Sequence, residues 1–125
     1  MIKCLLCVVG IGAVLYHLFP IVTVCGDSMY PTFKDGEIIL ATRLFRKSKL
    51  KKGDVVIYHA PNDGHRVVIK RIDKINTHSG VMYCLGDNSE VSYDSRMYGY
   101  VSLRKLVCKP IKQRVKAESE VANNE

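Results

Sequence analysis

Two residues of this sequence, Ser28 and Lys70, have surroundings that suit hydrolytic chemistry. Ser28 lies in the segment GDSMYPT (26–32), where the flanking glycine and proline favour a tight bend that can present a hydroxyl group. A serine nucleophile needs a base. Lys70 lies in the segment VVIKRI (67–72), and strand alternation would place it on one face with Val68 and Ile72.

A lysine on an apolar face usually lays its stem along that face and extends its ammonium group into water. If the amine is buried instead, its pKa falls, and the neutral form can accept a proton near neutral pH. On this second interpretation Lys70 is the general base for Ser28. The four histidines, His17, His59, His65 and His78, have no distinctive context. A Ser-His-Asp arrangement nevertheless stays open, because triads are not recognised from sequence spacing.

The segment GDNSEVSYDSRMYG (86–99) predicts a polar loop with many local hydrogen-bonding groups. Asp94 and Arg96 can form a structural ion pair there. Ser92 or Ser95 can hydrogen-bond the amine of Lys70 and orient it.

The N-terminal segment is apolar, with no Lys, Arg, Asp or Glu from Cys4 to Val24. Pro20 disfavours helix at Phe19, so we expect a helix from Ile2 to Leu18 or Phe19, roughly 25–27 Å long. We expect residues 1–20 to be a retained transmembrane anchor, with a cleaved signal peptide as the alternative. The flanking charges are too evenly balanced to predict its orientation.

The remaining sequence changes to an extended pattern. Short β-rich runs separated by Gly, Pro, Asn and Asp predict strands over 37–42, 55–60, 65–75, 80–85 and 98–103. We therefore expect a mostly β fold, with a compact antiparallel domain over residues 21–108. Residues 109–125 form a polar tail that we expect to be disordered. A disulfide between Cys84 and Cys108 stays open.

The chain has 125 residues, enough for one domain, and a net charge of +7. Its densest basic run lies over residues 43–52. No helix-turn-helix pattern or interleaved aromatic residues accompany this run, so we expect it to face anionic lipid rather than nucleic acid. Cys4 and Cys7 lack a second ligand pair, so we expect no metal site.

Four segments in order, GDSMYPT, GDVVIYHAP, VVIKRI and GDNSEVSYDSRMYG, resemble the signature of the type I signal peptidases, proteases with a Ser-Lys dyad. The resemblance implies a membrane-bound enzyme that needs no cofactor. It also implies a single-pass protein of the cell membrane whose protease domain lies on the trans side and cleaves signal peptides from exported preproteins. By motif, Ser28 matches the nucleophile and the backbone oxyanion donor, Lys70 the general base, and Ser92 the residue that orients the lysine. Asp94 and Arg96 match a structural pair near the site.

Two positions depart from well-known members of that family. Gly26 stands where some relatives carry a serine that helps to bind the oxyanion, and Ser89 stands where arginine is common. Three alternatives also remain. The chain can be a specialised maturation protease of the same type, for example for conjugation pilins. It can be a self-cleaving repressor protease, although an apolar segment replaces the DNA-binding domain, or a non-catalytic membrane-anchored β domain.

Overall fold

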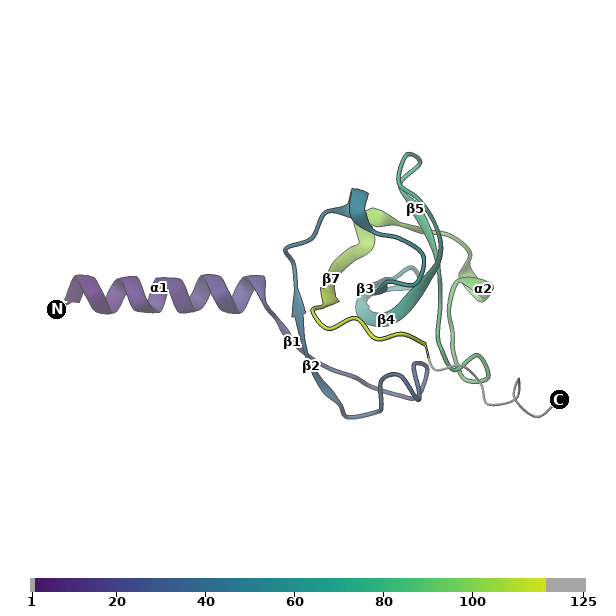
Figure 1. The fold of residues 1–125 in the computed structure, drawn as a ribbon, viewed down its shortest axis with the longest axis horizontal. Helices are drawn as coiled ribbons and strands as arrows, with labels where there is room; N and C mark the ends of the chain where they lie inside the picture. Colours follow the sequence, from purple (N-terminus) through teal and green to yellow (C-terminus); the bar gives the residue numbers. More distant parts are fainter. Residues whose placement is uncertain (1, 117–125) are drawn as a thin grey trace.

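The computed structural model describes residues 2–116, which form one helix joined to a β domain (Figure 1). Helix α1 spans Ile2–Leu18, as predicted. The strands are β1 (Ile21–Thr23), β2 (Ile38–Thr42), β3 (Val55–Ala60), β4 (Asp63–Asn76), β5 (Val81–Leu85), β6 (Val101–Ser102) and β7 (Leu106–Pro110). The short helical segments are η1 (Lys47–Lys49), α2 (Ser95–Tyr98) and η2 (Leu103–Lys105).

The strands form a sheet in the order β1-β2-β7-β3-β4-β5-β6, and neighbouring strands are antiparallel. The predicted mostly antiparallel β fold is therefore confirmed. The long strand β4 serves two neighbours, because residues 63–71 pair with β3 and residues 71–76 pair with β5. The strand expected over 98–103 is reduced to β6, because Tyr98 ends α2 and Leu103 begins η2.

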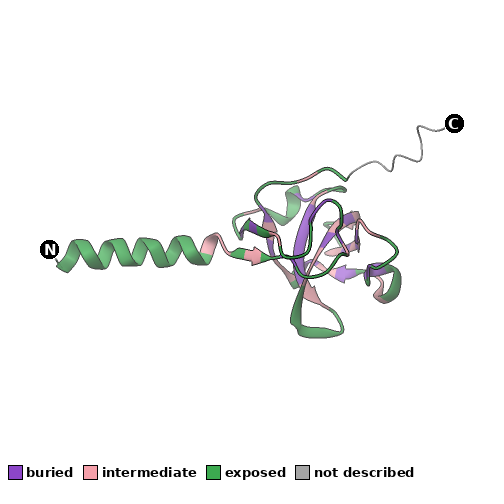
Figure 2. Cartoon of the chain, turned by 90° about the horizontal axis from the view of Figure 1, so that it is seen from below, coloured by how far each residue is buried: buried purple, intermediate pink, exposed green. Residues whose placement is uncertain are grey.

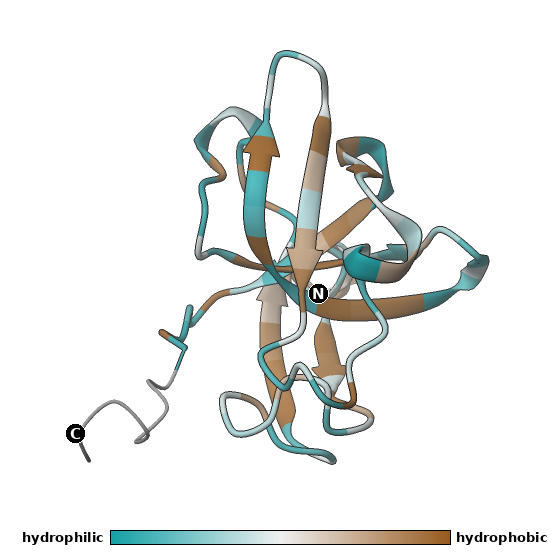
Figure 3. Ribbon diagram, turned by 90° about the vertical axis from the view of Figure 1, so that its right-hand side faces the viewer, coloured by the Kyte–Doolittle hydropathy of each residue, from teal (hydrophilic) through white to brown (hydrophobic). Residues whose placement is uncertain are grey.

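Strand β3 is buried on both faces. Val55 and Ile57 pack in one apolar cluster, and Val56 and Tyr58 pack in a second cluster on the opposite face. This explains why β3 has a continuous buried run from Val55 to Tyr58 instead of alternating with exposed polar residues. In Figure 3 most of the brown, hydrophobic stretches lie in the strands, and the turns that join them are mainly teal or white. The central strand thus gives β4 a rigid neighbour.

Helix α1 projects away from the β domain and is exposed along nearly its whole length (Figure 2). It ends before Pro20, and Arg43 closes its last turn through hydrogen bonds from its Nε to His17 O and from its backbone N to Leu18 O, both 2.8 Å. Within residues 2–116, no helix has the length and hydropathy needed to cross a membrane, so the predicted transmembrane character of α1 is not confirmed.

The packed domain continues beyond Cys108, the end that we expected. Strand β7 runs to Pro110, where it pairs with Ala41. The side chain of Gln113 then bonds the backbone of Val55, and Arg114 pairs with Glu37. The expected disordered tail is therefore packed in its first part, because these side chains cover open backbone groups of the domain. The rest of that expectation, residues 117–125, lies outside the described residues.

Cys84 and Cys108 are both free and buried. They lie in different apolar clusters, Cys84 in the cluster on one face of β3 and Cys108 in the cluster on the other. The disulfide that the sequence left open is therefore not formed.

Candidate active site

Ser28 lies in a bend between β1 and β2 that two buried side chains hold in place. Met29 and Phe33 insert into the first apolar cluster, while Ser28 itself remains partly exposed. Gly26 precedes it with a φ of +86°, in the left-handed region that favours glycine, and its N–H donates to Asp35 Oδ1 at 2.7 Å. The bend therefore presents the Ser28 hydroxyl on a fixed backbone.

Lys70 lies in β4, opposite Val56 of β3. The residue is only 4% exposed, so its side chain does not extend into water. Its Nζ lies 2.8 Å from Ser28 Oγ, although the two residues are 42 positions apart in the sequence. The structure therefore joins the two residues that the sequence singled out, and it favours the buried amine over the solvated one.

The surroundings of Lys70 make its amine easier to deprotonate. Burial, which disfavours the ammonium form, lowers the pKa of Lys70 from 10.5 to about 8. The negative charge of Asp94 acts in the opposite direction, and the positive charge of Arg66 adds to the lowering. A substantial neutral fraction is therefore present in mildly alkaline solution, and this form has the lone pair that a general base requires.

The start of the polar loop, residues 86–88, is bonded directly to the Ser28 bend. The backbone N–H of Asn88 donates to Ser28 O at 2.9 Å, and its side-chain Nδ2 donates to Asp27 O at 3.1 Å. Thr32 Oγ1 donates to Asp87 Oδ2 at 2.6 Å. Two segments far apart in the sequence thus fix the backbone on which the nucleophile sits.

Arg71, the residue after Lys70, connects the same loop to β4. Its guanidinium donates to both carboxylate oxygens of Asp87, at 2.9 and 2.8 Å, and to Gly53 O at 2.7 Å. Both side chains of this bidentate pair are largely buried. Because Asp87 also accepts from Thr32, one carboxylate ties the strand that carries Lys70 to the bend that carries Ser28.

Ser92, Asp94 and Arg96 form a hydrogen-bonded group beside the dyad. Ser92 Oγ donates to Asp94 Oδ2 at 2.7 Å, and Arg96 pairs with the same buried carboxylate at 2.7 Å. Asp94 also accepts from the N–H of Gly86 at 2.9 Å. Burial raises the pKa of Asp94, but the hydrogen bonds from Arg96, Gly86 and Ser92 outweigh it and hold that pKa well below its usual range.

The structure gives Ser92 a different contact from the one we expected. Among residues 2–116 its hydroxyl is bonded to Asp94, and no hydrogen bond joins it to Lys70. The Ser92 O–H group donates to the carboxylate of Asp94 because an ionised acceptor forms a stronger hydrogen bond than an amine does. Ser92 still lies at the site, since it and Ser28 O both lie against Gly86.

Two surface cavities meet at the dyad. Both are lined by Ser28, Lys70, Arg66, Val68 and Cys25. The first continues between residues 22–24 and 67–69, and the second continues toward the loop that carries Val91 and Tyr93. No histidine lines either cavity, and all four histidines lie within residues 2–116. The geometry therefore favours Lys70 over a histidine as the base.

Sequence reasoning missed two residues of the site, Arg66 and Gly86. Arg66 precedes Lys70 by four positions, so strand alternation already places it on the face of Val68 and Lys70. Gly86 reads as an ordinary turn residue, but a Cβ there would lie 2.0 Å from Ser92 Oγ and 2.7 Å from Ser28 O. That contact brings the polar loop, which holds Gly86 and Ser92, against the distant bend of Ser28, so no local pattern indicates it.

The chain is similar to known proteins over more than half of its length. Mitochondrial inner membrane protease subunit 1 of Homo sapiens is 34% identical over 98 residues, which cover 63% of this chain and 59% of that protein. Signal peptidase IB of Staphylococcus aureus (strain N315) is 35% identical over 75 residues, which cover 57% of this chain and 39% of that protein. The chain thus spans less than two thirds of the length of these relatives. A family model described as signal peptidase, peptidase S26, matches residues 1–77, a range that includes Ser28 and Lys70, and the chain belongs to this family.

Proposed function

We propose that this protein is a serine endopeptidase in which Lys70 activates Ser28. The observation that carries the proposal is the separation of 2.8 Å between Lys70 Nζ and Ser28 Oγ, with the amine buried. A base within hydrogen-bonding distance of a hydroxyl can remove its proton as the oxygen attacks. The lowered pKa of Lys70, about 8, makes this proton transfer accessible under mildly alkaline conditions.

The reaction follows from these two groups. Neutral Lys70 takes the proton of Ser28 as Oγ forms a bond to the scissile carbonyl carbon. Lys70 then gives that proton to the departing amine as the C–N bond breaks, which leaves an ester on Ser28. Water attacks this ester, Lys70 accepts a proton from the water and returns it to Ser28 Oγ, and the new carboxylic acid leaves.

The oxyanion of each tetrahedral intermediate needs a donor. Within residues 2–116 the N–H of Ser28 makes no backbone or side-chain hydrogen bond, whereas the N–H of Gly26 is occupied by Asp35. We assign the Ser28 N–H to the oxyanion. Gly26 has no hydroxyl to add a second donor, and in other hydrolases removal of one donor costs about 3–4 kcal/mol of transition-state stabilisation.

The substrate is, on this proposal, an extended segment that lies along the first cavity. Residues 22–24 and 66–69 border that cavity, and both stretches have an open strand edge because, among residues 2–116, each pairs with only one neighbouring strand. An extended peptide can add to such edges through its main chain. The apolar lining from Val22, Val24, Ile57 and Val68 suits small side chains. These features support signal peptides of preproteins as substrates.

Membrane attachment through α1 belongs to the same proposal. The helix is apolar and largely exposed, and within residues 2–116 none of its residues belongs to either apolar cluster of the β domain. Exposed apolar surface of this extent is typical of membrane or protein contact sites. We propose that α1 inserts into the cell membrane as a single-pass anchor, with the protease domain on the trans side next to membrane-bound preproteins.

The test is cleavage of a model preprotein in detergent. We expect the wild-type protein and His65→Ala to cut after a small residue, and Ser28→Ala and Lys70→Ala to be inactive. His65 is a matched control because it lies on the same strand as Lys70 but outside both cavities. Residual cutting by Lys70→Ala, or an inactive His65→Ala, would show that the dyad is wrong. No cutting by any form at any pH would instead support a non-catalytic β domain.

A further inference from the structure

The basic loop, which we define as residues 43–52, holds nearly all of the excess charge of the protein. It contains six of the 19 basic residues and none of the 12 acidic residues, so the rest of the chain is almost balanced, with 13 basic and 12 acidic residues. Within residues 2–116, none of the six forms a salt bridge. The loop therefore presents a concentrated positive charge that the neighbouring described residues do not neutralise.

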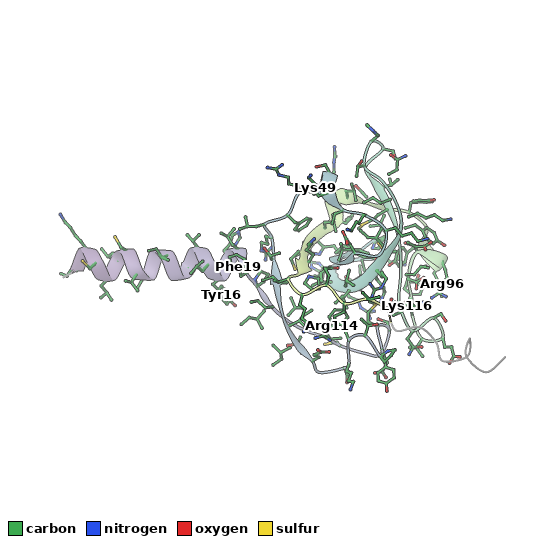
Figure 4. All side chains as sticks on the ribbon, in the orientation of Figure 1. Tyr16, Phe19, Lys49, Arg96, Arg114 and Lys116 are labelled. Atoms are coloured by element: carbon green, nitrogen blue, oxygen red, sulfur yellow. The ribbon has the colours of Figure 1, made fainter. Side chains whose placement is uncertain are left out.

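The basic loop begins where α1 ends. Arg43 bonds the last turn of α1 through His17 O and Leu18 O, so the first residue of the loop touches the base of the helix. Figure 4 shows Lys49 toward the end of the β domain from which α1 leaves, whereas Arg96 and Lys116 lie toward the opposite end. If α1 lies in a lipid bilayer, this loop is on the side of the domain that faces the lipid headgroups.

The basic loop is held on the domain by its own apolar residues. Leu50 is buried in the second apolar cluster, and Phe45 packs against the same cluster. Leu44, by contrast, is 60% exposed, between Arg43 and the buried part of the loop. A loop with a fixed backbone, one exposed leucine and six outward charges has the combination that binds at an anionic membrane surface.

The strands next to the base of α1 extend this surface with apolar side chains. Ile21 of β1 lies opposite Leu40 of β2, and Ile38 lies opposite Thr23, the next pair on the same face. All three apolar side chains are more than half exposed. These exposed apolar residues and the basic loop that follows β2 together offer apolar side chains for the acyl layer and basic side chains for the headgroups of a bilayer.

We propose that the basic loop binds anionic lipid headgroups and holds the β domain against the membrane, with Leu44 at the lipid interface. The proposal rests on the proposed membrane attachment of α1, but not on the protease activity. It adds a preference for anionic lipid, which an apolar helix alone does not give.

The chain contains no tryptophan, so a single introduced tryptophan reports on one place. We would reconstitute full-length Leu44→Trp in vesicles of brominated lipid, either phosphatidylcholine alone or phosphatidylcholine with phosphatidylglycerol. Met97→Trp in α2 is the control reporter, because this exposed residue lies at the far end of the domain from α1 (Figure 1). In anionic vesicles we expect the fluorescence of the tryptophan at position 44 to be quenched and shifted to the blue. Both effects should be weaker in neutral vesicles or at high salt. The tryptophan at position 97 should show neither effect.

Charge variants test whether the lipid preference comes from the basic loop or from the net charge of the protein. Arg46→Gln, Lys47→Gln and Lys49→Gln are combined in the Leu44→Trp protein, and the matched control combines Lys74→Gln, Arg104→Gln and Lys105→Gln. All six are exposed. We expect the lipid preference to be lost in the first variant and kept in the second, with peptide cleavage in detergent unchanged in both.

The result that overturns the inference is equal quenching in both lipids, or an equal effect of the two charge variants. Displacement of the loop from anionic vesicles by a short DNA duplex at physiological salt would also overturn it and assign the loop to nucleic acid. If no variant stays with vesicles of either composition, the attachment through α1 fails together with this inference. Loss of peptide cleavage in detergent would concern only the proposed protease activity.

Discussion

Gly86 and Ser92 are in such close contact that the site has no room for a side chain at position 86. A Cβ atom built on Gly86 would lie 2.0 Å from Ser92 Oγ and 2.5 Å from Ser92 Cβ. The same Cβ would lie 2.7 Å from Ser28 O, the carbonyl of the proposed nucleophile. Gly86 therefore allows the polar loop to approach the bend of Ser28 while its own N–H bonds Asp94.

Gly86→Ala should reduce activity far more than stability. The added methyl group must displace Ser92 or the backbone of Ser28, and overpacking of this kind costs about 1–3 kcal/mol of unfolding free energy. A displacement of about 1 Å at a reacting group can cost roughly 100-fold in rate. The measurements are kcat/KM on a model preprotein and urea unfolding. Gly64→Ala is the control, since no atom lies within 4 Å of the added Cβ there. Wild-type activity in Gly86→Ala would contradict this role of the contact.

Lys70→Met should make the protein more stable at pH 7 while abolishing activity. Because the pKa of Lys70 is lowered from 10.5 to about 8, the unfolded chain binds more protons between these values, and stability rises with pH across that window. At pH 7 the folded protein carries the full free-energy cost of burying the charged ammonium group, at most roughly 3 kcal/mol. Methionine has no charge and removes this cost. Chemical denaturation at pH 7 and at pH 11 checks the sign, since the stabilisation should disappear at pH 11. A less stable variant at pH 7 would show that burial of the Lys70 ammonium group does not destabilise the folded protein.

Arg66→Gln should move the acidic limb of the pH-rate profile to higher pH. The positive charge of Arg66 disfavours the ammonium form of Lys70, so its removal raises the pKa of Lys70 and reduces the neutral fraction at a given pH. Arg66→Glu should give a larger shift in the same direction. The measurement is kcat/KM from pH 6 to 10, with exposed Arg104→Gln as the control. A change in KM at every pH without a shift of the limb would assign Arg66 to substrate contact alone.

The two candidate residues Ser28 and Lys70 could be singled out from the sequence because each has a local signature. Gly26 and Pro31 mark the bend of Ser28, and the alternation of Val68, Lys70 and Ile72 marks a lysine on an apolar face. The contact of Ser92 could not be predicted in the same way. Whether its hydroxyl bonds Lys70 or Asp94 depends on how the polar loop folds back on itself, which no spacing encodes.

The strands were predictable where they are long and apolar, and not where pairing alone creates them. Strands β2 to β5 carry runs of β-branched and aromatic residues, whereas β1 has three residues and β7 contains Pro110. β7 exists because it fills the position between β2 and β3 in the sheet. Such a strand is determined by its neighbours more than by its own residues.

Arg71→Met should destabilise the protein strongly, because it leaves the carboxylate of Asp87 buried without its partner. Breaking one side of a buried pair typically costs about 3–5 kcal/mol. Asp87→Asn keeps the shape but removes the charge, so the double variant should lose less stability than the sum of the two single variants. Urea unfolding of the four proteins gives this coupling. Additive losses would mean that the pair does not act as a unit.

Asp87→Asn should also flatten the acid side of the stability curve. Burial raises the pKa of Asp87, but the hydrogen bonds from Arg71 and Thr32 outweigh it, so the pKa lies below the ordinary 3.8. A lowered carboxyl pKa gives stability that is present above the unfolded value and is lost as pH falls through the folded value. We therefore expect the wild-type protein to lose more unfolding free energy than Asp87→Asn between pH 5 and pH 2. Parallel curves would remove Asp87 from the acid response.

Gln113→Ala should destabilise the β domain even though position 113 lies beyond the strands. Gln113 Oε1 accepts from Val55 N at 2.6 Å, and its Nε2 donates to Val55 O at 3.1 Å, so this side chain takes the place of a strand partner for β3. Without it the buried N–H of Val55 has no acceptor, which costs about 1–3 kcal/mol. The neighbouring exposed Lys112→Ala should change stability by less than about 0.5 kcal/mol. Equal melting temperatures for the two variants would mean that residues after Pro110 do not support the fold. A selective loss in Gln113→Ala would show that the segment after β7 stabilises the strand against which Lys70 is positioned.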